Sequence, residues 1–185
     1  MAKRNSLSLE CLVLKRKPLG ETDRIVTIVS QKLGKSVAVA KGVRRLSSSF
    51  SASLEPGNLI RAQLIITKSI PLLIQARLIE DASSTKTNLA QIRRLTQVLE
   101  IFDKLFVEEE LPAITYSLVL SIRKKLLQNR TNLIRSDLQK LLNQLGFATN
   151  SSQIDQSMLE YVQEIVERPM QSFKYLQTDA LKVFP

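Results

Sequence analysis

The 185-residue sequence contains no histidine and only one cysteine, Cys11. Without histidine, the chain lacks the commonest general base, the Ser-His and Cys-His nucleophile arrangements and the usual zinc ligands. A single cysteine excludes a disulfide within the chain and fits the reducing cytosol. The acidic residues are scattered, and Glu108, Glu109 and Glu110 read as a solvent-exposed helix end. We therefore expect no catalytic activity, no cofactor and no bound metal.

Long apolar runs are also missing. No stretch of about 18 apolar residues is present, so no segment is expected to cross a bilayer. Residues 1–6 lead into strand-like alternation and not into the apolar core of a signal peptide. With 44% hydrophobic and 24% charged residues, the composition is that of a globular protein. These features predict a cytoplasmic location.

Positive charge is concentrated in the first eighty residues. Residues 1–80 contain fourteen Lys and Arg against five Asp and Glu, a net charge of +9, whereas residues 81–185 contain thirteen against twelve, a net of +1. This asymmetry favours a polyanion as partner of the first part. An anionic membrane surface is the weaker alternative, because no basic amphipathic helix with large apolar anchors is present there.

Five segments of the first part have strand character, and they are separated by turns or by Pro and Gly. Residues 59–67 alternate cleanly, with Ile60, Ala62, Leu64 and Ile66 on one face. Residues 72–80 repeat the pattern, with Ile74, Ala76 and Leu78 opposite Gln75 and Arg77, which is typical of antiparallel strands with one wet face. We expect Pro18 to end the first strand. Five short strands and one long loop predict a small oligonucleotide-binding (OB) barrel. The predicted strands cover residues 9–17, 22–30, 36–41, 59–67 and 72–80.

The long loop, residues 42–57, follows a strand that ends in a basic cluster formed by Lys41, Arg44 and Arg45. Such a loop is either functional or a solvent-exposed turn, and both interpretations stay open here. Phe50 is the only aromatic residue among the first eighty, so the barrel offers no platform for stacking bases. Binding should therefore depend on phosphates and be indifferent to sequence, and neutralising two strands at once could assist their annealing.

Beyond residue 81 the apolar period becomes helical. One stripe runs from Leu89 to Phe106, and a second helix opens at Leu111 and Pro112 with Ile114 on its stripe. A third helix stops at Gly146, and a fourth contains Val162 and Ile165. The predicted fold class is thus α+β, with an OB barrel in residues 1–80 and an all-α domain in residues 81–185.

Several segments resemble the bacterial recombination mediator RecO. They are residues 12–27, which contain Gly-Glu-Thr-Asp-Arg, residues 39–45 (Val-Ala-Lys-Gly-Val-Arg-Arg), residues 54–57 (Leu-Glu-Pro-Gly) and residues 75–80. Residues 141–147 and 168–176 resemble later family segments less closely. The resemblance implies DNA repair and recombination: binding of single- and double-stranded DNA, strand annealing, and RecA loading at gaps together with RecR. It also implies that the helical region binds the acidic, apolar C-terminal tail of single-stranded DNA-binding protein.

The resemblance assigns DNA contact to four basic positions, Arg24, Lys41, Arg44 and Arg45, and charge alone adds Lys15, Arg16 and Lys35. Candidates for meeting the acidic tail are Arg93, Arg94, Arg123, Lys124 and Lys125. The last three also fit the favourable end of a helix dipole, which is a purely structural role. Many family members carry a four-cysteine zinc module after the position of Phe147. This sequence has no cysteine there, which puts any RecR contact through that module in doubt.

Three other functions remain open on the sequence. An RNA- or ribosome-associated OB module would prefer structured RNA over matched DNA. A scaffold whose barrel only supports a protein-binding helical domain would not bind nucleic acid at physiological salt. A metal-dependent nuclease would degrade DNA when magnesium is supplied.

Overall fold

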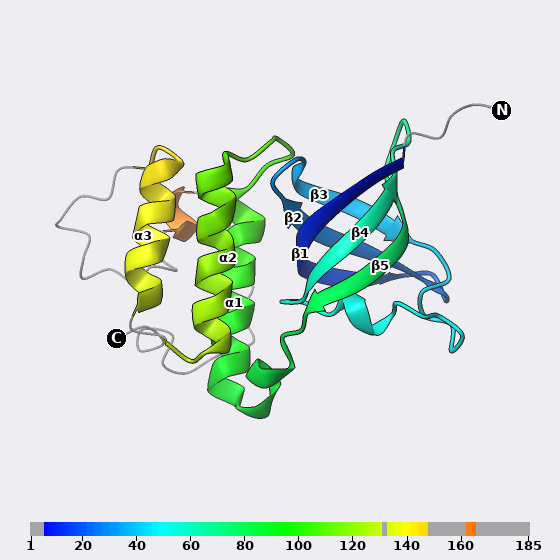
Figure 1. Cartoon of the computed structure of the whole chain (residues 1–185), viewed down its shortest axis with the longest axis horizontal. Helices are drawn as coiled ribbons and strands as arrows, with labels where there is room; N and C mark the ends of the chain where they lie inside the picture. Colours follow the sequence, from blue (N-terminus) through cyan, green and yellow to red (C-terminus); the bar gives the residue numbers. More distant parts are fainter. Residues whose placement is uncertain (1–5, 131–132, 148–161, 166–185) are drawn as a thin grey trace. The chain divides into compact units, whose positions relative to one another are not determined.

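The computed structural model describes residues 6–130, 133–147 and 162–165 (Figure 1). It divides the chain into two compact units: Met1–Ala82 with Phe106–Leu111, and Ser83–Leu105 with Pro112–Pro185. That the domains part at residue 80 stays a prediction. The labelled elements are β1 (Ser6–Leu19), β2 (Asp23–Ser30), β3 (Gly34–Ala40), η1 (Ala52–Leu54), β4 (Leu59–Ile65), β5 (Leu72–Glu80), η2 (Ser83–Thr87), α1 (Leu89–Leu105), α2 (Ala113–Leu127) and α3 (Ile134–Gln144).

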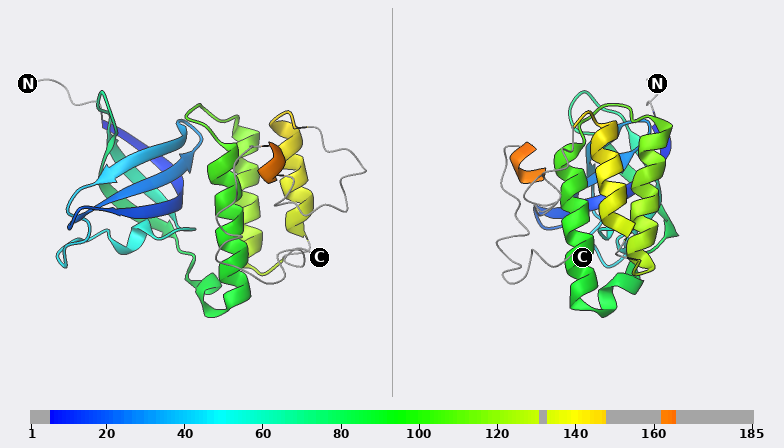
Figure 2. Two further views of the ribbon diagram at one scale, coloured as in Figure 1. Left: turned by 180° about the vertical axis from the view of Figure 1, so that it is seen from behind. Right: turned by 90° about the vertical axis from the view of Figure 1, so that its left-hand side faces the viewer.

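The five strands form a closed barrel in the order β1-β2-β3-β5-β4. The long strand β1 pairs with β4 through its first half and with β2 through its second half. All neighbours are antiparallel except β3 and β5, which pair in parallel at Val39 and Leu72. Figure 1 shows β1, β4 and β5 as the near wall, and the left view of Figure 2 shows β2 and β3 from behind. The predicted OB-type fold with following helices is confirmed.

The barrel is filled by alternate residues of its strands, and the long loop closes one end. Val26, Ile28 and Ala38 belong to the buried core, as strand alternation requires. From the loop, Val43 and Leu54 are fully buried, and Phe50 packs against the same core. The loop is therefore a packed cap and not a solvent-exposed turn along its whole length.

Two strand predictions are wrong in detail. Strand β1 continues through Pro18 to Leu19, because Pro18 lies opposite Arg24 near the strand end, where a missing N–H donor is tolerated. In β5, Ile74 does not share a face with Ala76. The pairing shifts between Gln63 and Leu64, so β5 has one extra residue there, and Ile74 is 44% exposed while Ala76 is buried.

A short segment from between the first two α-helices, Phe106–Leu111, packs on the barrel. The amide of Lys35 donates to the carbonyl of Val107 at 2.8 Å, and the amide of Leu111 donates to the carbonyl of Gln31 at 2.8 Å. The side chain of Phe106 is 1% exposed. The sequence placed Phe106 on a helical stripe, but α1 ends at Leu105. We call Phe106–Leu111 the strap.

The helical unit follows the predicted stripes except at Leu89 and Ile92 of α1 and Ile114 of α2, which are exposed. Leu99 on α1, Ile122 on α2 and Leu141 on α3 are buried, whereas Ile114 on α2 is 65% exposed. Helix α3 ends at Gln144, and Gly146 follows with a φ of 85°, the left-handed conformation expected of a helix stop. Of the predicted fourth helix only residues 162–165 lie within the described part, and they are helical. The family-like segment 168–176 lies outside it.

No helix within the described residues has the length and hydropathy that crossing a membrane requires. In the same residues, no group of three or more His, Cys, Asp and Glu side chains is placed to hold a metal ion.

Candidate nucleic-acid interface

The Gly-Glu-Thr-Asp-Arg segment (residues 20–24) and the basic segment of residues 39–45 meet at one end of the barrel. Strands β2 and β3 place Arg24 opposite Ala40, so the turn before β2 lies beside the loop after β3. One Asp23 carboxylate oxygen accepts the amide of Gly42 at 2.7 Å and the hydroxyl of Thr22 at 2.9 Å. Gly42 has a φ of 65°, a conformation that glycine adopts without steric cost. Asp23 therefore holds the start of the basic loop against the first turn.

The electrostatics of Asp23 agree with this role. The hydrogen bond from the Gly42 amide, followed by that from Thr22, holds the pKa of the Asp23 carboxyl below its ordinary value of 3.8. Burial opposes this shift, and the positive charges of Lys41 and Arg45 lower the pKa by smaller amounts. A carboxylate bonded to backbone N–H groups favours its charged form. Asp23 is thus the ionised anchor of a cationic loop.

Three of the predicted DNA-binding residues, Lys41, Arg44 and Arg45, are exposed around this anchor. The amide of Arg44 donates to the carbonyl of Thr22 at 2.8 Å, and its Nη1 donates to the carbonyl of Gly20 at 3.0 Å. These bonds fix the direction of Arg44 while the side chain stays at the surface. Three cations on a fixed loop are suited to phosphate oxygens.

Arg24 and Arg16 have a different environment from the exposed cations. Arg24 is half-buried, and its Nη1 donates to the carbonyl and hydroxyl oxygens of Ser51 at 3.4 and 3.3 Å. Burial, and then the charge of Arg16, lower the pKa of Arg24, although arginine remains protonated in proteins. Arg16 pairs with Glu55 at 2.6 Å. Both arginines therefore link the strands of the barrel to the loop of residues 42–57.

The remaining two predicted cations, Lys15 and Lys35, lie in different parts of the barrel. Lys15 lies opposite Thr27 and is exposed on the outer face of the barrel. Lys17, which sequence reasoning did not select, is also exposed and lies opposite Ile25 on the same face. The period of two along β1 was the signal that could have found it. Lys35 is at the far end of β3, where its amide contacts the strap, and is not brought together with the loop cluster.

The five candidates for partner binding also occupy different environments. Arg123 is buried at 2% exposure, so it is not a surface residue as the sequence suggested. Lys125 forms an ion pair with Asp137, which is 7% exposed, and so links α2 to α3. Arg94 donates to the side-chain oxygen of Asn129 at 3.3 Å, and Arg93 is half-buried on α1. Of these five only Lys124 is classed as an exposed residue.

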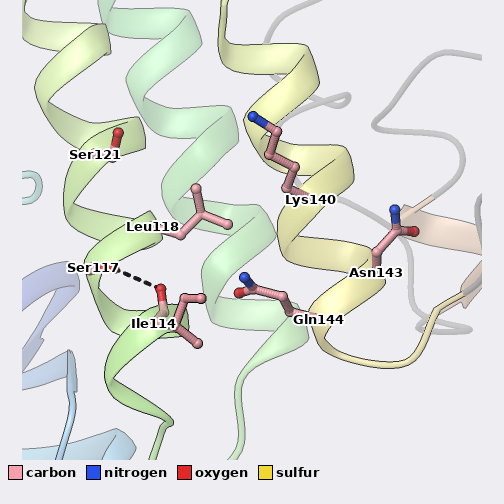
Figure 3. Close-up of a pocket in the computed structure, with 7 residues that line it drawn as sticks. All are labelled: Ile114, Ser117, Leu118, Ser121, Lys140, Asn143 and Gln144. Atoms are coloured by element: carbon pink, nitrogen blue, oxygen red, sulfur yellow. Dashed lines mark hydrogen bonds between the residues drawn. The ribbon is translucent and has the colours of Figure 1, made fainter.

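A groove between α2 and α3 has a different cation at its edge (Figure 3). Its volume is about 480 Å³, and Ile114 and Leu118 form its apolar part. Lys140, whose side chain is 66% exposed, lies on the α3 side, 3.9 Å from Asp137. An apolar floor beside one cation can accept an apolar side chain and a carboxylate. The groove is lined by Ile114, Ser117, Leu118, Ser121, Lys140, Asn143 and Gln144.

The sequence model of the family described as "Recombination protein O N terminal" matches residues 4–82. Three relatives, each named "DNA repair protein RecO", come from Frankia casuarinae, Nocardioides sp. and Cutibacterium acnes. The first two are 35% and 36% identical over 112 residues, covering 60% of this chain and 46% of theirs. The third is 40% identical over 75 residues, covering 40% of this chain and 30% of its own. The matches thus span less than half the length of these relatives.

Proposed function

We propose that the chain, whose residues 4–82 match the N-terminal family model of recombination protein O, acts in DNA repair and recombination as a DNA-binding mediator without catalytic activity. The observation that carries the proposal is the cluster of exposed cations, Lys41, Arg44 and Arg45, on a loop anchored by Asp23. We define these three as the loop cluster. It supplies the phosphate contacts.

The chemistry of the loop cluster favours the DNA backbone over the bases as its main target. Guanidinium groups bind phosphate oxygens through charge-assisted hydrogen bonds, and such contacts do not depend on sequence. Lys15 and Lys17 add positive charge on the outer face of β1. Binding single and double strands alike, and neutralising two strands together, supports annealing of complementary strands. Cooperation with RecR in loading RecA at gaps is the family role that this activity would serve.

Reversing the charge of Arg44 and Arg45 together tests the DNA contact. Neutralising about six phosphates gives a log–log slope of duplex affinity against salt near −5, from roughly −0.9 per phosphate. We expect Arg44→Glu with Arg45→Glu to weaken binding to all sequences alike and to flatten the slope by about 1–2. The measurement is fluorescence anisotropy of labelled DNA over a series of salt concentrations.

The matched control is Lys32→Glu with Arg77→Glu, which changes the net charge equally at two exposed positions outside the loop cluster. It should lose less affinity than the Arg44 and Arg45 variant. Equal losses would mean that binding follows net charge and not this site. A strong preference of the wild type for structured RNA over matched DNA would instead favour an RNA- or ribosome-associated role.

For the helical unit we propose that the α2–α3 groove receives the acidic, apolar C-terminal tail of single-stranded DNA-binding protein. Ile114 is an exposed apolar residue at this groove, and the side chain of Lys140 is exposed beside it. This pairing fits a peptide that ends in an apolar side chain and a carboxylate (Figure 3). It replaces the cationic helix end as the preferred site, because Arg123 is buried and Lys125 is paired.

Titration of a fluorescent tail peptide tests the groove. Lys140→Glu should weaken the peptide about tenfold or more, because a charge-assisted contact becomes a repulsion. Lys124→Glu is the matched control, since it makes the same charge change on the exposed face of α2. If Lys124→Glu weakens the peptide and Lys140→Glu does not, the tail binds at the cationic end of α2.

A further inference from the structure

Among the described residues, Leu46 has the most exposed large apolar side chain. Its exposure is 108%, so it touches little of the protein, whereas the corresponding value for Ile114 is 65%. Single apolar residues on a surface are common and by themselves mean nothing. Leu46 differs because it directly follows Arg44 and Arg45 in the loop cluster.

The backbone around Leu46 is held in place by hydrogen bonds. The amide of Ser48 donates to the carbonyl of Arg45 at 3.0 Å, which makes Leu46 and Ser47 the two central residues of a turn. The amide of Arg45 in turn donates to the carbonyl of Gly42 at 3.1 Å. Leu46 is thus presented on a bonded turn.

Apolar anchors on both sides attach this turn to the barrel. Val43, three residues before Leu46, is fully buried, and Phe50, four residues after it, packs against the barrel core. The apolar residues that the fold needs from this part of the loop are therefore already in the core. Because Phe50 is held there, the only aromatic residue of residues 1–80 is not placed at the surface to stack on a base.

We propose that Leu46 is a base-contacting wedge, which inserts between neighbouring bases of unpaired DNA while Arg44 and Arg45 hold the flanking phosphates. Leu side chains serve this purpose in proteins that unstack DNA steps, where the apolar contact offsets part of the lost stacking. The inference rests on the proposed DNA binding and adds a contact to bases. A strand whose bases are separated in this way is open to pairing with its complement.

The test uses single-stranded DNA with 2-aminopurine at one position, whose fluorescence rises when its neighbours unstack. We expect the full-length wild type to raise this fluorescence. Leu46→Ser should abolish most of the rise and lower affinity about threefold to tenfold, as expected for losing part of one apolar contact. The salt slope should stay unchanged, since no charge is removed.

Leu46→Met should retain the fluorescence rise, because methionine is also an apolar wedge. Leu89→Ser, which removes a leucine that is 60% exposed on α1, should behave as wild type. Unchanged thermal unfolding of Leu46→Ser would show that the loss is local.

If Leu46→Ser binds DNA and unstacks it as the wild type does, the wedge is overturned while the loop cluster stands. If the wild type binds with the expected salt slope but causes no fluorescence rise, the wedge is again overturned. If the wild type does not bind DNA at all, the proposed function fails and the wedge fails with it.

Discussion

At the residue scale, the loop cluster depends on a residue of opposite charge. Asp23 accepts hydrogen bonds from Gly42 and Thr22, and Lys41 and Arg45 stabilise its charged form. The acidic position of the Glu-Thr-Asp-Arg signature is therefore explained by geometry: it places the basic signature that follows in the sequence. Removing it should disturb the loop even though it removes a charge that repels DNA.

Replacing Asp23 by Asn should lower the free energy of unfolding in a pH-dependent way. Because the folded-state pKa of Asp23 lies below 3.8, its stabilising contribution is complete above that value and is lost as pH falls through the lower folded pKa. The difference between wild type and Asp23→Asn should thus be present at about pH 6 and shrink towards about pH 3.

Urea denaturation at both pH values measures this difference, and Glu21→Gln serves as the control at an exposed neighbouring carboxylate. A constant difference between wild type and Asp23→Asn at the two pH values would contradict the anchoring role.

At the element scale, the strap makes residues far along the chain part of the barrel unit. The carbonyl of Val107 accepts the amide of Lys35, and the backbone of Glu109 approaches Gly34 so closely that no side chain fits there. A Cβ atom on Gly34 would lie 2.5 Å from the Val107 carbonyl oxygen and closer still to that of Glu109. The turn between β2 and β3 is therefore shaped to receive the strap.

Gly34→Ala should destabilise the barrel by at least about 3 kcal/mol, because it adds a backbone clash to the cost of a left-handed conformation. Gly20→Ala provides a matched control. Gly20 has a φ of 58°, nearly that of Gly34 at 57°, but a Cβ atom there would meet nothing within 4 Å. It should cost only about 1–2 kcal/mol.

The two variants are compared by urea denaturation, with circular dichroism as the signal that reports unfolding. Equal losses of stability would show that the strap does not press on Gly34.

At the scale of the whole molecule, the two proposed ligand sites belong to different units and differ in chemistry. The cations proposed to contact DNA belong to the barrel unit, and the groove proposed for an acidic peptide belongs to the helical unit. The Arg44 and Arg45 variant should therefore keep its affinity for the tail peptide, and Lys140→Glu should keep its affinity for DNA. Titrating each variant with both ligands checks this, and a loss of both affinities in either variant would mean that the sites are not separate.

The positions of strands and helices could largely be predicted, because the spacing of apolar residues can be read from neighbouring residues in the sequence. The alternation from Ile60 to Leu64 predicted β4, and the stripe from Leu95 to Phe102 predicted α1. Pairing irregularities could not be predicted in this way. The extra residue in β5, which exposes Ile74, depends on how β5 meets β4 and leaves no local signal.

The candidate site was predicted in composition but not in arrangement. The sequence could separate the basic residues only by resemblance and by charge. In the structure Arg24 and Arg16 hold the loop of residues 42–57, Lys35 lies at the other end of β3, and Arg123 is buried. Lys17 and Lys140 were missed, because their place in a candidate site depends on which face of β1 or α3 they lie on.

The sequence by itself determined the class of elements, the asymmetry of charge and the family signatures, because each of these is carried by residue type and by spacing along the chain. Only the tertiary structure decided which cations reach the surface and which stabilise the fold, and that the strap completes the barrel unit. The physical reason is that burial and hydrogen-bond partners arise between segments far apart in sequence. Asp23 and Gly42, or Lys35 and Val107, meet only after the chain has folded.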